Sequence, residues 1–127
     1  MKLRIQGNSL RFRVTRPEVA RLMDAGRIEE TVYFAADGEH KLTYALEHDA
    51  KADSIALRYQ AAGVTVILPA EQARVWAEGD SVGIYHAADV GDHGTLEVIV
   101  EKDFACLAGS EEENADAFPN PNAGSHC

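Results

Sequence analysis

The C-terminal segment, residues 104–127, holds the richest set of candidate metal ligands in the sequence. Cys106 follows the last predicted strand, and His126 and Cys127 are adjacent to each other further on. Thiolate and imidazole groups together suit zinc or iron, so we predict a metal site at Cys106, His126 and Cys127. The alternative is a disordered acidic tail in which Cys106 is a small buried residue, because no Cys-x-x-Cys spacing supports the site.

A second group of potential ligands lies between His86 and His93, where two histidines and two aspartates occur within eight residues. Such a group could hold a divalent cation. However, His86 continues the alternation of Val82 and Ile84, which places it with the core side chains. Asp92 belongs to the residue types that form turns. We therefore expect a turn and a core histidine here in preference to a metal site.

Four cations share one face of the first predicted hairpin. In KLRIQGNSLRFR, apolar residues alternate with Lys2, Arg4, Arg11 and Arg13, which directs these four side chains away from the core. Like charges on one sheet face repel each other unless an anion lies over them. The face could simply be solvated, could bind a phosphate or carboxylate ligand, or could contact acidic residues of the chain itself.

Motifs that would identify a reaction are scarce. The sequence has no phosphate loop, no His-Glu-x-x-His and no dinucleotide-binding fingerprint. Cys106 lies between Phe104 and Leu107, and this apolar setting does not favour a reactive thiolate. We therefore expect a protein that is not an enzyme.

Composition and charge indicate a globular protein with a strong charge asymmetry. The 127 residues are 46% hydrophobic and 26% charged, which is ordinary for one domain. Seven cations against two acids give residues 1–27 a net charge of +5, so the other hundred residues carry −14 of the total of −9. The acidic total argues against nonspecific nucleic-acid binding. Because the sequence has two cysteines and no signal-peptide pattern, we expect reduced thiols in the cytoplasm. The longest apolar run, residues 64–68, is too short to cross a membrane.

Period-two alternation predicts a mainly β fold of about eight antiparallel strands. The residues expected to face the core are Leu3/Ile5, Leu10/Phe12/Val14, Val32/Phe34, Leu42/Tyr44/Leu46, Ile55/Leu57/Tyr59, Val64/Val66/Leu68, Val82/Ile84 and Leu96/Val98/Val100. We expect the strands to close into a barrel or to form a strongly coiled sheet.

Two short helices interrupt the strands. Thr15 and Glu18 form a capping box, Val19, Leu22 and Met23 supply the inward stripe, and Gly26 ends the first helix in a left-handed conformation. The second helix follows Pro69, buries Ala73, Trp76 and Ala77, and ends at Gly79.

The two helices resemble each other, since PEVARLMDAG (17–26) and AEQARVWAEG (70–79) share Glu, Ala, Arg and Gly at matching positions. We therefore predict one domain over residues 1–127 with a pseudo-two-fold strand–strand–helix–strand–strand repeat. Residues 1–47 form the first repeat, residues 54–103 form the second, and residues 104–127 form an acidic tail.

Residues 64–85, VTVILPAEQARVWAEGDSVGIY, resemble the GD-box element of cradle-loop barrels. In that element Gly79 would turn the chain out of the helix and Asp80 would hydrogen-bond backbone amides. The first half of the chain departs from the pattern, because Arg27 stands where the aspartate would be.

A second resemblance covers nearly the whole chain. KLRIQGNSLRFRVTRPEV at the start, ILPAEQARVW and VGIY in the middle, and EKDFACL with PNPN near the end are similar to a family of small bacterial proteins that is a domain of unknown function. This resemblance implies that the C-terminal segment belongs to the domain, and it implies no activity.

These observations predict a small cytoplasmic binding or accessory protein with a metal site in its C-terminal segment. The partner is then an anionic ligand or another protein. The alternatives are a transition-state-regulator-like DNA-binding barrel and a small metal-dependent hydrolase that acts on an anionic substrate. We also predict that acidic residues of the chain cover the basic face of the first hairpin, with Phe118 as an apolar anchor. These acidic residues are Glu101, Asp103, Glu111, Glu112, Glu113 and Asp116.

Overall fold

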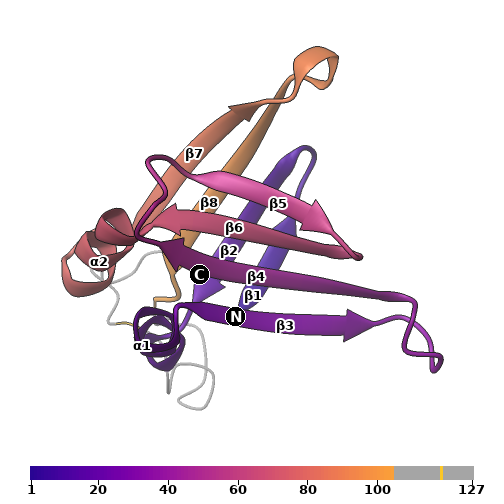
Figure 1. The fold of residues 1–127 in the computed structure, drawn as a ribbon, viewed down its shortest axis with the longest axis horizontal. Helices are drawn as coiled ribbons and strands as arrows, with labels where there is room; N and C mark the ends of the chain where they lie inside the picture. The colour runs from indigo at the N-terminus through magenta and orange to yellow at the C-terminus, as the bar shows by residue number, and fades with distance from the viewer. Residues whose placement is uncertain (105–117, 119–127) are drawn as a thin grey trace. The chain divides into compact units, whose positions relative to one another are not determined.

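The computed structural model of the chain describes residues 1–104 and residue 118. In these residues, eight strands and two α-helices form a mainly β protein (Figure 1). The elements are β1 (Lys2–Ile5), β2 (Ser9–Val14), α1 (Arg16–Ala25), β3 (Arg27–Tyr33), β4 (Lys41–Asp49), β5 (Ala56–Gln60), β6 (Gly63–Pro69), α2 (Ala70–Glu78), β7 (Gly83–Asp89), the short 3-10 helix η1 (Gly91–His93) and β8 (Thr95–Lys102). The order strand–strand–helix–strand–strand thus occurs twice along the chain.

The strands form two open four-stranded sheets, in the orders β1-β2-β8-β7 and β3-β4-β6-β5. Each sheet consists of two antiparallel hairpins, and the hairpins meet through a parallel pair, β2 with β8 or β4 with β6. The prediction of antiparallel strands alone is therefore wrong. In every hairpin the second strand lies next to the other hairpin, and two such strands run in the same direction. No closed barrel is present in the described part of the chain.

The chain divides into two compact units. The first unit contains residues 1–19 and the residues from 82 onward, and the second contains residues 20–81. Each unit contains one of the two sheets. Each sheet therefore combines one hairpin from residues 1–47 with one hairpin from residues 54–103, so a sheet is not built from a single predicted repeat.

The core side of the first sheet follows the predicted alternation. Phe12 and Val14 on β2 have no exposed surface, and Val98 and Val100 on β8 are almost completely buried. Ile5 was expected on the same side, but it is 60% exposed. It is the last residue of the short edge strand β1, where only one neighbouring strand is present to cover it.

In the second sheet, the predicted residues Leu46, Val66 and Leu68 are buried, and so is Ile28, which was not predicted. Tyr59 on β5 and Val82, which precedes β7, were expected in the core but are 76% and 41% exposed. Trp76 on α2, which contacts β4 and β6, is only 2% exposed, so the prediction that it is a core residue is confirmed. Ala73 is buried beside it on the same helix, whereas Ala77 and, on α1, Met23 are only half-buried.

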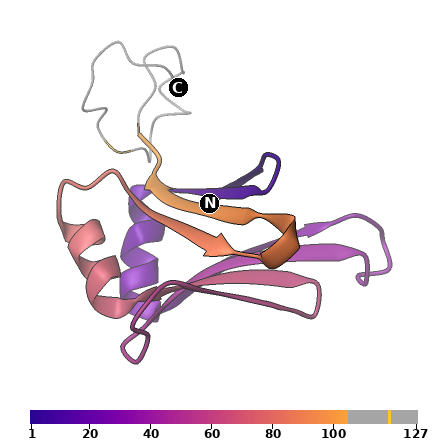
Figure 2. The same ribbon diagram turned by 90° about the horizontal axis from the view of Figure 1, so that it is seen from above.

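Val32 and Phe34 were expected in the core but are 41% and 67% exposed. Strand β6 begins at Gly63, opposite Thr43, so the end of the β3–β4 hairpin has no neighbour on that side. Figure 2 shows this hairpin projecting beyond β5 and β6. Alternation identified the strand correctly but could not show that its neighbour was shorter.

The two helices end differently, although a glycine follows each. Gly26 has a φ of 83°, the left-handed conformation that was predicted. Gly79 has a φ of −98°, and a Cβ atom there would lie 2.8 Å from the Val75 carbonyl oxygen. Gly26 is therefore needed for its backbone angle and Gly79 for the close approach of the chain, so the two glycines do not close equivalent caps.

At its start, α1 has the predicted pairing of Thr15 with Glu18, in a modified form. The Glu18 carboxylate accepts hydrogen bonds from the Thr15 amide and hydroxyl, both at 2.9 Å. It also binds the ammonium group of Met1. Burial raises the pKa of Glu18, but the bonds from the Met1 ammonium and from Thr15 outweigh this effect, so the pKa is lowered overall.

Candidate anion-binding face

Strand pairing brings the four cations of the first hairpin together on one face, which we name the basic face (Lys2, Arg4, Arg11 and Arg13). Lys2 lies opposite Arg13, and Arg4 lies opposite Arg11. The face is the reverse of the side on which Phe12 and Val14 are buried. Like charges placed directly across two strands destabilise the pairing, so this arrangement needs anions nearby.

Two carboxylates at the end of β8 neutralise part of the basic face. The Glu101 Oε1 atom lies 3.0 Å from Arg13 Nε and 3.8 Å from Arg11 Nε. The Asp103 Oδ2 atom lies 3.2 Å from Lys2 Nζ. These two residues belong to the acidic set that was expected to cover the face; the other four lie outside the described residues, so covering by the tail stays a prediction.

Arg4 differs from the other three cations. Among the residues that the structure describes, no carboxylate lies within ion-pair distance of its guanidinium group. Arg4 and Arg11 border a hollow of about 410 Å³, which is open to solvent. Its lining consists of Arg4, Gln6, Asn8, Ser9, Arg11, Thr95, Glu97 and Ile99. Guanidinium, amide and hydroxyl groups therefore line one cavity beside the Glu97 carboxylate, and the guanidinium and amide groups can bind carboxylate and phosphate oxygens.

The turn between β1 and β2 holds one side of this hollow in place. Gln6 and Ser9 exchange backbone hydrogen bonds of 3.2 and 3.1 Å, and Gly7 supplies the positive φ of 55° that the turn requires. The Asn8 side chain donates to the Thr95 carbonyl at 3.1 Å, which attaches the turn to β8. The backbone amide of Glu97 also donates to the Asn8 carbonyl at 3.1 Å. The lining is thus ordered before a ligand arrives, which lowers the entropic cost of binding.

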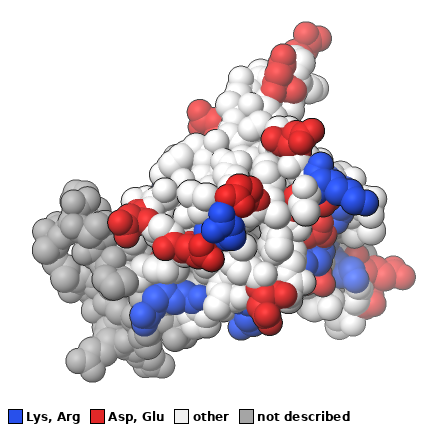
Figure 3. All heavy atoms as spheres, turned by 60° about the vertical axis from the view of Figure 1, so that its left-hand side comes forward, with Lys and Arg blue, Asp and Glu red and all other residues white. Residues whose placement is uncertain are grey.

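The other two strands of the same sheet and the turn between them carry acidic residues. Asp89 at the end of β7 and Asp92 in η1 lie at the turn between β7 and β8. Acidic side chains are visible on this turn at the top of Figure 3. The first sheet therefore has cations on β1 and β2 and acids on β8, β7 and their turn. Because the β7–β8 turn begins beside Asn8 and Thr95, these acids disfavour an anion at the turn end of the hollow and leave Arg4 and Arg11 as its favourable place.

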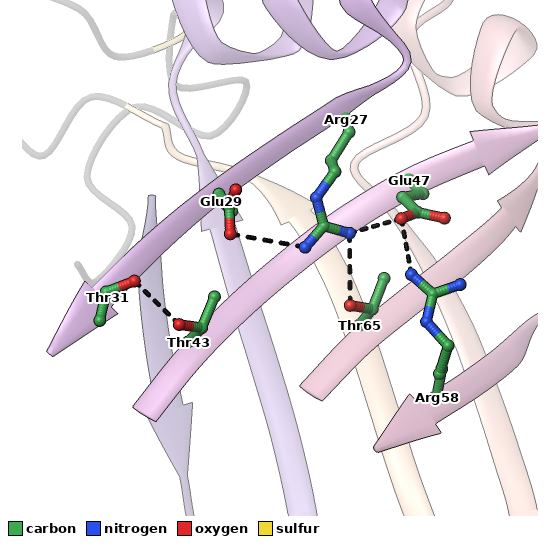
Figure 4. Close-up of polar contacts among 7 residues, drawn as sticks. All are labelled: Arg27, Glu29, Thr31, Thr43, Glu47, Arg58 and Thr65. Carbon is green, nitrogen blue, oxygen red and sulfur yellow. Dashed lines mark hydrogen bonds and ion pairs between the residues drawn. The ribbon is translucent and has the colours of Figure 1, made fainter. Parts of the chain in front are cut away.

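A second polar cluster lies on the second sheet and was not predicted from the sequence (Figure 4). Glu47 accepts hydrogen bonds from Arg27 Nη1 and, at 2.7 Å, from Arg58 Nη2. Arg27 also reaches Thr65 Oγ1 at 3.4 Å and Glu29 at 3.5 Å. We name Arg27, Glu47 and Arg58 the Glu47 network. The sequence holds one signal for this network, because Arg27 and Glu47 alternate with core residues along β3 and β4.

The Glu47 network satisfies its own charges. Burial raises the pKa of Glu47, but hydrogen bonds from Arg58 and Arg27 lower it by more, so the carboxylate is held in its charged form. Both arginines bind this one carboxylate, and Arg27 has a second acid in Glu29. The cluster thus links β3, β4 and β5 and does not present an unpaired cation to a ligand.

The predicted metal sites have different outcomes. Cys106, His126 and Cys127 lie outside the described residues, so that site stays a prediction. His86, Asp89, Asp92 and His93 are described, and the structure does not bring them together: no group of three or more His, Cys, Asp or Glu side chains with metal-binding geometry occurs in the described residues. Instead, the Asp89 carboxylate accepts the Gly91 amide at 2.9 Å, which is the turn that was expected.

One catalytic pattern was missed in the sequence: Gly79-Asp80-Ser81-Val82-Gly83 has the Gly-x-Ser-x-Gly spacing of a nucleophile elbow. In such an elbow a strand precedes the serine and a helix follows it. Here α2 precedes Ser81 and β7 follows it, which is the reverse order. The match is therefore one of spacing alone, and we assign no catalytic role to Ser81.

Phe118 is anchored at the end of β8. Its amide donates to the Asp103 carbonyl at 2.7 Å, and its ring meets the Phe104 ring edge-on with 6.1 Å between centroids. The Lys102 ammonium lies 5.4 Å from the centroid of the same ring. Phe118 thus contacts the end of β8 through Lys102, which pairs with Val14 and so lies on the side of the sheet opposite the basic face. Lys102 was not singled out in the sequence, where it follows the inward alternation of Val98 and Val100.

Comparison with known proteins gives one match. A family model matches residues 1–122, and its description is a family of unknown function (DUF7009). No match was found among curated proteins or among solved structures. In the described residues, no helix is long and apolar enough to span a membrane.

Proposed function

The chain belongs to this family of unknown function, and we propose that it is a binding protein whose basic face holds a small carboxylate- or phosphate-bearing ligand at Arg4 and Arg11. The observation that carries the proposal is the facing pair of these two arginines at the edge of a 410 Å³ hollow. Arg4 has no carboxylate partner among the described residues. The ion pair between Arg11 and Glu101 is a long one, with 3.8 Å between Nε and Oε1. A ligand oxyanion placed between the guanidinium groups would relieve their repulsion and accept hydrogen bonds from both.

The surroundings of the two arginines favour a small ligand over a nucleic acid. Duplex DNA carries one phosphate charge for about every 1.7 Å of its axis and therefore needs an extended cationic track. On this face, Glu97, Glu101 and Asp103 lie within or beside the cationic group. These acids would repel an extended polyanion more strongly than a single oxyanion held between Arg4 and Arg11.

The hollow offers groups that bind an anion. Its lining contributes two guanidinium groups, the amides of Gln6 and Asn8 and the Thr95 hydroxyl, beside the Glu97 carboxylate. The Ser9 hydroxyl donates to the Gln6 carbonyl at 2.6 Å and helps to hold the turn. A volume of about 410 Å³ lies within the range of about 300–1,000 Å³ that is usual for small-molecule sites. We infer recognition of a ligand as the role of the site.

The test follows the arginine Nε–Hε resonances by NMR during titration with inorganic phosphate and, separately, with citrate. The proposal predicts saturable shifts at Arg4 and Arg11 for at least one of the two anions. Substitution Arg4→Gln should reduce the affinity at least tenfold, because one of two charge-assisted contacts is lost. Arg74→Gln is the matched control: Arg74 is an exposed arginine on α2 that pairs with Glu71 and Glu78, and its removal should change nothing.

Two results would contradict the proposal. One is the absence of saturable shifts at Arg4 and Arg11 at millimolar concentrations of both anions. The other is an equal response of Arg74 and Arg4, which would indicate nonspecific ion binding.

A further inference from the structure

The basic face continues across the sheet into an apolar surface. One residue from each strand of the first sheet stands in register: Arg4 on β1 pairs with Arg11 on β2, Arg11 with Ile99 on β8, and Ile99 with Tyr85 on β7. Because residues in register point to the same side of a sheet, these four side chains form one row. The row starts with two cations and ends with an aliphatic and an aromatic residue.

A second hollow lies at the apolar end of this row. It has a volume of about 350 Å³ and is lined by Tyr85, His86, Ala87, Glu97, Val98 and Ile99. Ile99 and Glu97 also line the hollow at Arg4 and Arg11. The two hollows are therefore neighbours that meet over β8. Their lining residues together come from all four strands of the sheet, from β1 to β7.

The side chains around this second hollow leave room for a ring. Tyr85 is 62% exposed, and its hydroxyl lies 3.2 Å from the position that a Cβ atom on Gly83 would take. The tyrosine ring therefore leans along β7 toward Gly83. On the other side of Tyr85, the next residue on this face is Ala87, which is small and exposed. An aromatic group could thus lie over Ile99 and Ala87 and against the Tyr85 ring.

Glu97 restricts where a ligand can carry charge. It borders both hollows and pairs in register with Ala87 on one side and Ser9 on the other. A second negative charge over the apolar hollow would lie close to this carboxylate and be repelled. A hydroxyl or amino group at the same place could instead donate a hydrogen bond to it.

From this arrangement we infer that the ligand is a small organic anion with an aromatic body and a single anionic head. The carboxylate or phosphate head binds Arg4 and Arg11, and the ring lies over Ile99 and Ala87 beside Tyr85. Neighbouring strands are about 4.8 Å apart, so the distance from β2 to β7 is about 10 Å, which suits a ligand of one aromatic ring with its head group. This inference rests on the proposed function and specifies the ligand class for the same site.

The experiment compares two phosphate monoesters with the same head, methyl phosphate and phenyl phosphate, by isothermal titration calorimetry. The full chain should bind phenyl phosphate about tenfold more tightly, because the ring buries apolar surface that the methyl group does not. Tyr85→Ala removes the aromatic wall and Ala87→Leu fills the hollow, so each should abolish most of the preference for phenyl phosphate over methyl phosphate.

The second sheet offers a matched control. Tyr33 is an exposed tyrosine with the same exposed fraction as Tyr85, 62%, so Tyr33→Ala should keep the full preference for phenyl phosphate. If both esters bind equally, or if Tyr33→Ala acts like Tyr85→Ala, the aromatic assignment is wrong while anion binding stands. If neither ester binds, the anion site itself is wrong, and the inference is overturned with it.

Discussion

The two sheets have the same pairing order but treat their charges in different ways. In the second sheet, Glu47 binds Arg27 and Arg58 together, so the positive charges have a carboxylate between them. In the first sheet, Arg4 and Arg11 face each other directly, and among the described residues the nearest carboxylate of Arg11 is 3.8 Å away. An identical strand arrangement thus supports two uses of arginine. One network joins strands of the fold, and the other is a pair of cations for which we propose a ligand.

The largest predicted effect on stability concerns the apolar side of the second sheet, and the effects on its polar side should be smaller. Trp76→Ala should lower the free energy of unfolding by about 3–5 kcal/mol, because it removes a large side chain that is only 2% exposed. Chemical denaturation checks this value. The control is Val75→Ala on the same helix, where the side chain is 53% exposed and the expected change is below about 0.5 kcal/mol. Equal effects of the two substitutions would show that Trp76 is not a core residue.

The next effect concerns the Glu47 network itself. Glu47→Gln should lower the free energy of unfolding by about 1–3 kcal/mol, because two arginines lose a charged hydrogen-bond acceptor. Glu71→Gln is a suitable control, since Glu71 pairs with Arg74 on the exposed side of α2 and such pairs contribute about 0–1 kcal/mol. A loss for Glu47→Gln no greater than for Glu71→Gln would show that the network does not stabilise the fold.

The same substitution predicts a pH dependence. The folded-state pKa of Glu47 is lowered from the ordinary value of 4.5, so its contribution to stability is present above that pH and is lost as the pH falls through the folded-state pKa. The stability difference between the wild type and Glu47→Gln should therefore be constant from pH 5 to 7 and shrink in more acidic solution. A difference that grows on acidification would mean that the pKa is raised instead of lowered.

A smaller effect is expected at the end of β8. Phe118→Ala should lower the free energy of unfolding by about 1–2 kcal/mol, because the Phe104 edge contact and the Lys102 cation–π contact are both lost. Phe34→Ala is the control, since Phe34 is 67% exposed and should contribute little. If thermal unfolding shows the same change for both variants, Phe118 is not an anchor for the chain at this sheet.

Local alternation in the sequence was enough to predict several features of the fold. Side-chain periodicity predicts the hairpins, the helices and the burial of Phe12 and Trp76. It also predicts that the side chains of the basic face lie on one side of the sheet. These features depend on residues that are close along the chain.

Features that depend on distant residues could not be predicted in this way. The parallel pairs β2–β8 and β4–β6 join segments with no local signature, so the strands appeared to be antiparallel throughout. For the same reason, only the pairing register shows that Arg11, Ile99 and Tyr85 form a row. The contact between Glu47 and Arg58 likewise joins strands that are distant in the sequence. The metal site at Cys106, His126 and Cys127 stays a prediction from residue type alone.

The most direct test compares one arginine from each sheet. The free energy of unfolding of the wild type, Arg4→Gln and Arg58→Gln is measured in chloride and in phosphate buffers of equal ionic strength. In chloride, Arg58→Gln should lose about 0.5–1 kcal/mol, because Glu47 loses a partner, whereas Arg4→Gln should be unchanged or slightly more stable, because Arg11 loses a like-charged neighbour. Phosphate should stabilise the wild type and Arg58→Gln equally and should have a smaller effect on Arg4→Gln, because a ligand stabilises only a fold that binds it. Destabilisation of Arg4→Gln in chloride equal to that of Arg58→Gln, or the same phosphate increment in all three proteins, would contradict the account.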